Sequence, residues 1–167
     1  MRKTYKLTLT AMFVAIGTVT SSLVFIPIGI VKAFPIQHIL NVMSAVILGP
    51  FYAVLQAFTI SLLRNLMGTG TLFAFPGSMI GALLASLLFI KTKKVYLAAG
   101  GEVVGTGLIG AVFCYPIATL FLGKEATLFG FIPSFIVSSF VGGVIGIIVL
   151  RVLMMNKGLE RSIQKSF

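Results

Sequence analysis

Two short segments of the sequence carry most of the polar side chains that could bind a small molecule. Each combines amide, hydroxyl, imidazole or cationic groups with phenylalanines, and a binding pocket typically has apolar and aromatic walls with a few fixed hydrogen-bonding groups. His38 is the one histidine, and its two ring nitrogens can fix a heteroaromatic ring. The candidate substrate-binding residues in these segments are Lys32, Gln37, His38, Asn41, Arg64, Asn65, Thr69, Thr71 and Phe75.

Glu102 is a further candidate because it is an acid within a long apolar stretch. If that stretch spans a membrane from Lys94, Glu102 lies about eight residues, or roughly 12 Å, into a hydrocarbon core of about 30 Å. A carboxylate at such depth is costly unless it is protonated, paired or bound to a polar ligand, so it indicates a functional role. We therefore expect Glu102 to bind substrate, with a structural hydrogen bond to a neighbouring helix as the alternative.

The remaining chemistry-bearing residues support neither catalysis nor a cofactor. Three acids, one histidine and Cys114 give no catalytic constellation, no metal-ligand spacing and no intrachain disulfide. There is no G-x-x-x-x-G-K-[ST] motif, so ATP hydrolysis is not expected. A G-x-G-x-x-G pattern at 105–110 lies inside an apolar stretch, where it favours close helix packing over nucleotide binding. We predict a protein that is not an enzyme and that holds no cofactor or metal.

The composition indicates that membrane-spanning helices position these residues. Of the 167 residues, 58% are apolar and 10% are charged, and the mean hydropathy is +1.12. A soluble domain could not cover that much apolar surface, whereas a bilayer removes the need. Gly49-Pro50 predicts a break in the long apolar stretch 33–63. We predict an all-α, single-domain bundle over residues 1–167 with six transmembrane helices at 5–26, 36–48, 51–67, 76–90, 95–120 and 129–153.

The placement of basic residues predicts the orientation of this bundle. The net charge is +10, but the lysines and arginines lie at the ends of apolar runs, which favours membrane interfaces over nucleic acid as their surroundings. If the N-terminus is placed in the cytoplasm, all but three of the 13 basic residues lie on the cytoplasmic side of the membrane, and the exceptions are Lys32, Arg64 and Lys124. By the positive-inside rule, both termini are predicted to be cytoplasmic and the two polar segments extracellular.

Several motifs in the chain are similar to those of a known transporter family. In order and content they resemble the thiazole-specific (ThiW) substrate-binding subunits, or S components, of energy-coupling factor (ECF) transporters, and the resemblance covers nearly the whole chain. The motifs are Pro27-Ile28-Gly29, Lys32, Pro35-Ile36-Gln37-His38, Asn65-Leu66-Met67-Gly68-Thr69-Gly70-Thr71, Phe75-Pro76-Gly77, Gly101-Glu102 and Gly105-Thr106-Gly107.

The resemblance implies a function, partners and a location. It implies a multi-pass subunit of a bacterial plasma membrane that captures hydroxyethylthiazole, the thiazole precursor of thiamine, on the outer side. Ala11 and Ala15 form a small-xxx-small pair on the first predicted helix, and the resemblance implies that they dock on a transmembrane coupling protein, the T component. Two cytoplasmic ATPases would then supply the energy, and the subunit would topple to present its pocket to the cytoplasm.

Other interpretations stay open at this stage. Hydroxyethylthiazole is neutral, so it offers Lys32 and Arg64 no anion, and a buried unpaired cation is costly. These cations could pair with Glu102 or face water, or the protein could carry another vitamin precursor with a negative charge. A structural membrane adaptor without a ligand, and a proton-coupled carrier that depends on Glu102, are the remaining alternatives.

Overall fold

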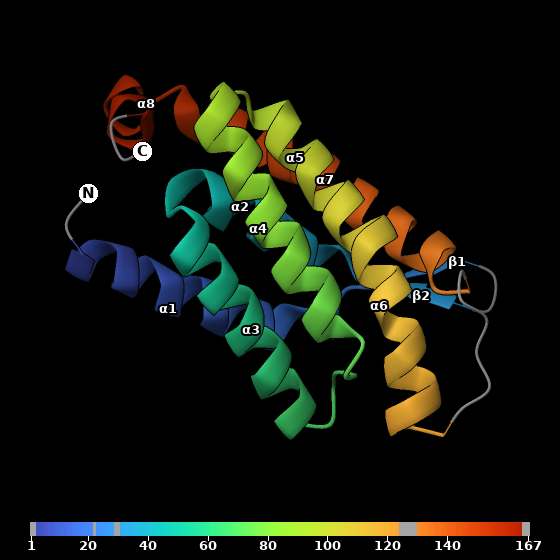
Figure 1. Ribbon diagram of the computed structural model, residues 1–167. Coiled ribbons are helices and arrows are strands. Elements are labelled where there is room, and N and C mark those ends of the chain that lie inside the picture. Colours follow the sequence, from blue (N-terminus) through green and yellow to red (C-terminus); the bar gives the residue numbers. More distant parts are fainter. Residues whose placement is uncertain (1–2, 22, 29–30, 124–129, 165–167) are drawn as a thin grey trace.

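The computed structural model describes residues 3–21, 23–28, 31–123 and 130–164, and it is a bundle of helices (Figure 1). A helix lies in each of the six predicted ranges, and a short helix follows the last of them. The helices are α1 (Lys3–Thr20), α2 (Pro35–Ile47), α3 (Pro50–Leu66), α4 (Ala74–Thr92), α5 (Val95–Val104), η1 (Gly105–Gly110), α6 (Ala111–Pro116), η2 (Ile117–Phe121), α7 (Ile132–Met154) and α8 (Lys157–Gln164).

A two-stranded hairpin lies between α1 and α2, and the first helix is therefore shorter than predicted. Strand β1 (Ile26–Ile28) pairs antiparallel with β2 (Val31–Ala33), so that Ile26 lies opposite Ala33. The prediction of helix over 21–26 is wrong, because α1 ends at Thr20. The segment after it is rich in β-branched and aromatic residues and contains Pro27, which cannot donate the backbone hydrogen bond that a helix needs.

Prolines begin the next two helices and separate them as the sequence predicts. Pro35 opens α2 and Pro50 opens α3, positions where the missing N–H costs nothing because the first turn has no acceptor for it. Gly49 lies between these helices with a φ of 88°, a conformation that favours glycine. This break divides the apolar stretch 33–63 into two helices that pack against each other.

The fifth predicted helix runs continuously from 95 to 121, but part of it is a π-helix. Its glycines pack directly on those of α4. A Cβ added at Gly105 would come within 2.7 Å of the Gly81 Cα, and one added at Gly110 would meet the Gly77 Cα. The expectation that the G-x-G-x-x-G pattern serves close helix packing is therefore confirmed.

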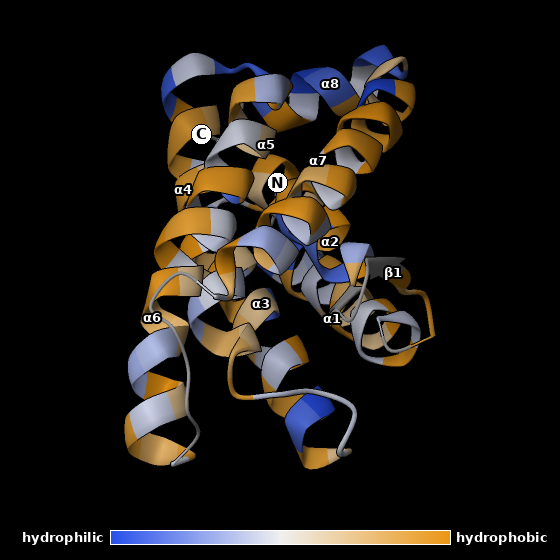
Figure 2. Cartoon of the chain, turned by 90° about the vertical axis from the view of Figure 1, so that its right-hand side faces the viewer, coloured by the Kyte–Doolittle hydropathy of each residue, from blue (hydrophilic) through white to orange (hydrophobic). Residues whose placement is uncertain are grey.

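Three helices in the described part of the chain are long and apolar enough to cross a membrane. They cover 74–92, 95–121 and 132–154, and they lie side by side in Figure 1. Most of the bundle is hydrophobic, whereas α8 is a hydrophilic cap on one end (Figure 2). The helical bundle is thus confirmed, while six crossings and cytoplasmic termini stay predictions. The start of α1 and α8 lie at one end of the bundle, and the hairpin lies at the other (Figure 1).

Candidate functional site

The two polar segments meet around a partly open cavity of about 160 Å³, whose lining includes the exposed residues Thr69 and Thr71. The cavity lies between α2, α3, α4, η1 and α7, together with the connection that follows α3. Its lining is formed by Phe34, Gln37, His38, Arg64, Thr69, Gly70, Thr71, Ala74, Ser78, Thr106, Ser134, Phe135 and Ser138. Polar groups and aromatic rings thus share one small space.

Arg64 supplies the positive charge at this cavity. Its Nη1 donates to Gln37 Oε1 at 2.8 Å and its Nη2 donates to the Thr69 carbonyl at 3.1 Å. The guanidinium carbon lies 5.5 Å from the centre of the Phe34 ring, within range of a cation–π interaction. Arg64 is only 5% exposed, so these contacts replace most of the water that a guanidinium would otherwise bind.

A line of hydrogen bonds continues from Arg64 across α2, α3 and α4. Gln37 Nε2 donates to Ser61 Oγ at 3.0 Å, and the hydroxyls of Ser61 and Ser78 lie 3.1 Å apart. Ser78 also donates to the Ala74 carbonyl at 2.7 Å, and its own carbonyl accepts from Asn41 Nδ2 at 3.2 Å. These residues are buried, so the line holds three helices in one register.

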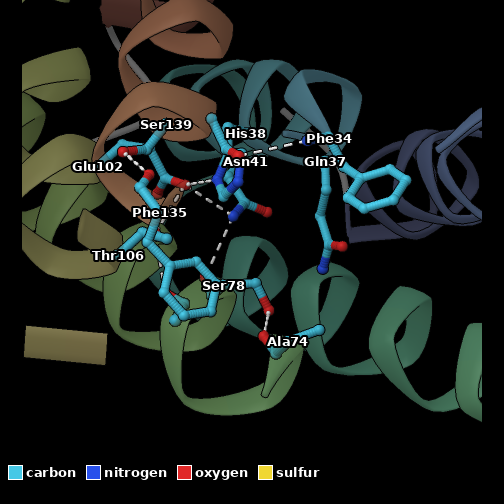
Figure 3. A network of polar contacts seen from close by, with 12 residues as sticks. Phe34, Gln37, His38, Asn41, Ala74, Ser78, Glu102, Thr106, Phe135 and Ser139 are labelled. Atoms are coloured by element: carbon cyan, nitrogen blue, oxygen red, sulfur yellow. Dashed lines mark hydrogen bonds and ion pairs between the residues drawn. The ribbon is translucent and has the colours of Figure 1, made fainter. Parts of the chain in front are cut away.

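The hydrogen-bond network ends at Glu102, which accepts from three side chains. Its Oε1 accepts from His38 Nδ1 at 2.8 Å, from Asn41 Nδ2 at 3.0 Å and from Thr106 Oγ1 at 3.0 Å. Figure 3 shows these side chains converging from α2, α5 and η1. When Glu102 is ionised its oxygens can only accept, so the contact then requires a proton on Nδ1 of His38 and leaves Nε2 for another partner. Glu102 is fully buried, so its hydrogen bonds determine the orientation of the imidazole at the cavity wall.

Glycine on α4 makes room for this carboxylate. A Cβ at Gly81 would clash with the Glu102 Oε2 and Thr106 Oγ1 atoms. The π-helical turn places Thr106 where its hydroxyl also reaches the Gly77 carbonyl at 2.9 Å. π-helical turns are frequent at functional sites. The close packing of α4 on η1 is therefore what allows a glutamate within the bundle.

Comparison with known proteins agrees with this geometry. A family model described as the thiamine-precursor transporter protein ThiW matches residues 7–156. The chain belongs to the ThiW family. It therefore belongs to a family of transporters rather than enzymes, and its long apolar helices are those of a membrane protein.

The fold of this ThiW-family protein is that of a known transporter subunit. A solved structure described as the S component of a bacterial ECF transporter matches with a TM-score of 0.76 at 19% identity. The match covers 92% of this chain and 97% of that one. No curated protein matches the sequence. At this identity the structural match establishes the shared fold.

The predicted site residues of the ThiW-family protein take up different positions relative to the cavity. Those that line it are Gln37, His38, Arg64, Thr69 and Thr71. Asn41 and Glu102 are fully buried behind the wall, where Glu102 contacts His38 and Asn41 contacts the Ser78 carbonyl. In the described structure, the Arg64 guanidinium donates hydrogen bonds to Gln37 and Thr69 and forms no ion pair with Glu102. A direct role of these residues in substrate binding stays a prediction.

Asn65 and Phe75 also lie outside the cavity lining. Asn65 donates to the Ser61 and Thr71 carbonyls at 2.8 and 3.0 Å, and thereby ties the connection after α3 to that helix. Phe75 packs towards Phe58, with ring centres 5.7 Å apart. Lys32 lies on β2, but its side chain is outside the described part of the chain.

Sequence reasoning missed the wall that α7 contributes. Ser134 and Ser138 line the cavity together with Phe135, and Ser138 Oγ accepts from the Phe34 amide at 3.3 Å. The available signal was the spacing of the two serines, which places them on one face of an otherwise apolar helix. Ser78 on α4, which also lines the cavity, was missed in the same way.

Proposed function

We propose that this protein is an S component that captures hydroxyethylthiazole at the outer face of a bacterial plasma membrane for ATP-driven uptake by partner subunits. The observation that carries the proposal is the small cavity in which His38, Arg64 and two phenylalanines meet. Membership of the thiamine-precursor transporter family supports a thiazole or a related precursor as the ligand.

The size of the cavity supports a ligand with one ring. An engineered protein cavity of about 150 Å³ holds one benzene molecule. The cavity here has a volume of about 160 Å³ and opens at Thr69 and Thr71, so a five-membered ring with short substituents fits within it, whereas the two linked rings of thiamine would extend beyond it. Size therefore favours a precursor over the finished vitamin.

The lining also supports a neutral, polar heteroaromatic ligand. Phe34 and Phe135 offer faces against which a ring can pack. The ring nitrogen and the hydroxyl of hydroxyethylthiazole need hydrogen-bonding partners, and His38 Nε2 and the serine hydroxyls of α7 supply candidates. Arg64 Nε has no partner among the described residues, so it is a further donor for an acceptor atom of the ligand.

The sequence contains no ATP-binding motif, and the S-component fold supports partner subunits as the source of energy. Ala11 and Ala15 are both exposed on α1, on a surface separate from the cavity lining. Small residues allow close approach of another helix in a bilayer, so this surface suits docking of a T component. Two ATPases bound to that component would complete the importer.

Calorimetric titration of the purified protein with hydroxyethylthiazole tests the proposal. We expect one ligand per chain, and affinity at least about tenfold weaker after His38→Ala, because the substitution removes a hydrogen-bonding group from the wall. Ser86→Ala is the matched control, since Ser86 is buried on α4 and bonds only within its own helix in the described structure. Absence of heat with folded protein, judged by its melting transition, would overturn the proposal and favour a structural adaptor.

A charged vitamin precursor is the second candidate, and Arg64 is the observation that favours it. The Arg64 guanidinium lines the cavity, and no carboxylate pairs with it in the described part of the chain. An anionic ligand would neutralise this buried charge. If carboxylated or phosphorylated single-ring compounds bind more tightly than hydroxyethylthiazole, this second assignment replaces the first.

A further inference from the structure

A second hollow lies on the outer surface of the bundle, between α5 and α7. It consists of two adjoining parts that share Tyr96, with volumes of about 320 and 350 Å³. One part lies at the end of the bundle near α8 and is bordered by Lys94 and Arg151. The other continues along the two helices and is lined by apolar side chains. We call the two parts together the α5–α7 groove.

The end of the groove near α8 is positively charged, because neither Lys94 nor Arg151 forms an ion pair within the described part of the chain. Lys94 and Arg151 are both exposed. The ion pair found among the described residues joins His38 with Glu102 and involves neither of these two cations. Helix α5 begins at this place without a side-chain cap, so its first amide groups point towards the same end of the groove. Two cations and an uncapped helix N-terminus together favour an anion here.

The rest of the groove is suited to a hydrocarbon chain. Its floor includes Ala99 and Gly143, and Gly143 leaves space there, since a Cβ added to it would make only ordinary contact with the Ala99 Cβ at 3.6 Å. Gly100 leaves one side open, since a Cβ added there would meet no atom within 4 Å. From Tyr96 to Val104 the groove follows eight residues of helix, or roughly 12 Å, which is close to the thickness of one leaflet's hydrocarbon layer of about 15 Å.

We propose that the α5–α7 groove binds one anionic diacyl phospholipid. The phosphate lies between Lys94 and Arg151 at the N-terminus of α5, and one acyl chain lies along the groove past Gly100. A phospholipid fits this surface better than a protein helix does, because one molecule of it supplies both the anion and the apolar chain at the required separation. The site is distinct from the interior cavity and does not depend on the proposed substrate.

Native mass spectrometry of the purified protein tests this proposal. The probes are dioleoyl phosphatidylglycerol, which is anionic, dioleoyl phosphatidylcholine, which has the same chains without net charge, and glycerol 3-phosphate, which has the charge without the chains. We expect one phosphatidylglycerol per protein, bound about 30-fold more tightly than phosphatidylcholine, because each basic residue near the membrane surface contributes to binding of anionic lipid. Glycerol 3-phosphate should not compete.

Three variants separate the headgroup site from the groove. The double variant Lys94→Gln/Arg151→Gln should reduce the preference for phosphatidylglycerol to about threefold or less. Gly100→Leu should block both lipids, and a Cβ at this position meets no atom within 4 Å in the folded protein. Lys91→Gln is the control, because it removes one exposed cation from the end of α4 without altering the groove.

The outcomes decide the proposal in either direction. Equal binding of both lipids to the unmodified protein, or an unchanged preference in the double variant, overturns the headgroup assignment. Displacement by glycerol 3-phosphate, or unchanged lipid binding by Gly100→Leu, overturns the assignment of the acyl chain. If the variants change the oligomeric mass and not the lipid count, the groove is a contact between protein chains and the proposal fails.

Discussion

Replacing Glu102 should weaken ligand binding even though its side chain does not line the cavity. In Glu102→Ala, Asn41 Nδ2 keeps the Ser78 carbonyl at 3.2 Å and Thr106 Oγ1 keeps the Gly77 carbonyl at 2.9 Å. His38 Nδ1 is different, because Glu102 is its one described partner. A buried donor without a partner costs about 1–3 kcal/mol. If binding requires the imidazole to stay in its present orientation, the affinity should fall roughly 5- to 150-fold.

Comparison with Glu102→Gln separates hydrogen bonding from charge. Glutamine keeps an oxygen at the Oε1 position, so His38 can still donate to it, and the loss of affinity should be clearly smaller than in Glu102→Ala. Calorimetric affinity for hydroxyethylthiazole is the readout, and the melting transition in detergent identifies any variant that fails to fold. Equal losses in the two variants would refute the role of Glu102 as an acceptor that positions His38. Unchanged affinity in folded Glu102→Ala would refute the coupling altogether.

Further predictions concern packing, charge and ligand size. Gly105→Ala should lower the free energy of unfolding by about 1–3 kcal/mol, because its Cβ would lie 2.7 Å from the Gly81 Cα, whereas Gly100→Ala should be neutral in the same melting experiment. Arg64→Met should remove the hydrogen bond to Gln37 Oε1 and weaken binding in a calorimetric titration, while a gain in affinity would contradict a role for the cation. Asn65→Ala should weaken binding less than Arg64→Met, since Asn65 acts through the backbone after α3. Thiamine should displace hydroxyethylthiazole poorly in a competition titration, because two linked rings exceed a cavity of about 160 Å³.

Hydropathy and backbone-restricting residues were enough to predict most of the helices. The apolar stretches and the Gly49-Pro50 break give α2 and α3 within one residue of their observed ends. The error in α1 arose because hydropathy does not distinguish a helix from a short apolar hairpin. The π-helical turn at 105–110 was also beyond prediction, since glycines that permit close packing are compatible with either type of helix.

Residue chemistry likewise predicted part of the candidate site. Polar side chains in apolar surroundings are costly, so their presence alone singled out His38, Arg64 and Glu102. Their grouping into two segments next to phenylalanines predicted a small-molecule pocket, and five of the residues named from the sequence line the cavity. The fold class, the membrane character and the family resemblance all followed from these local patterns.

Only the tertiary structure decided how those groups are paired. His38 and Glu102 are 64 residues apart in sequence, and they meet between α2 and α5, where Gly81 of α4 leaves room for the Glu102 carboxylate. Arg64 bonds to Gln37 across two helices, a pairing that the order of residues in the chain does not reveal. The physical reason is that burial cost depends on residue type, which the sequence contains, whereas hydrogen-bond partners depend on which helix faces meet.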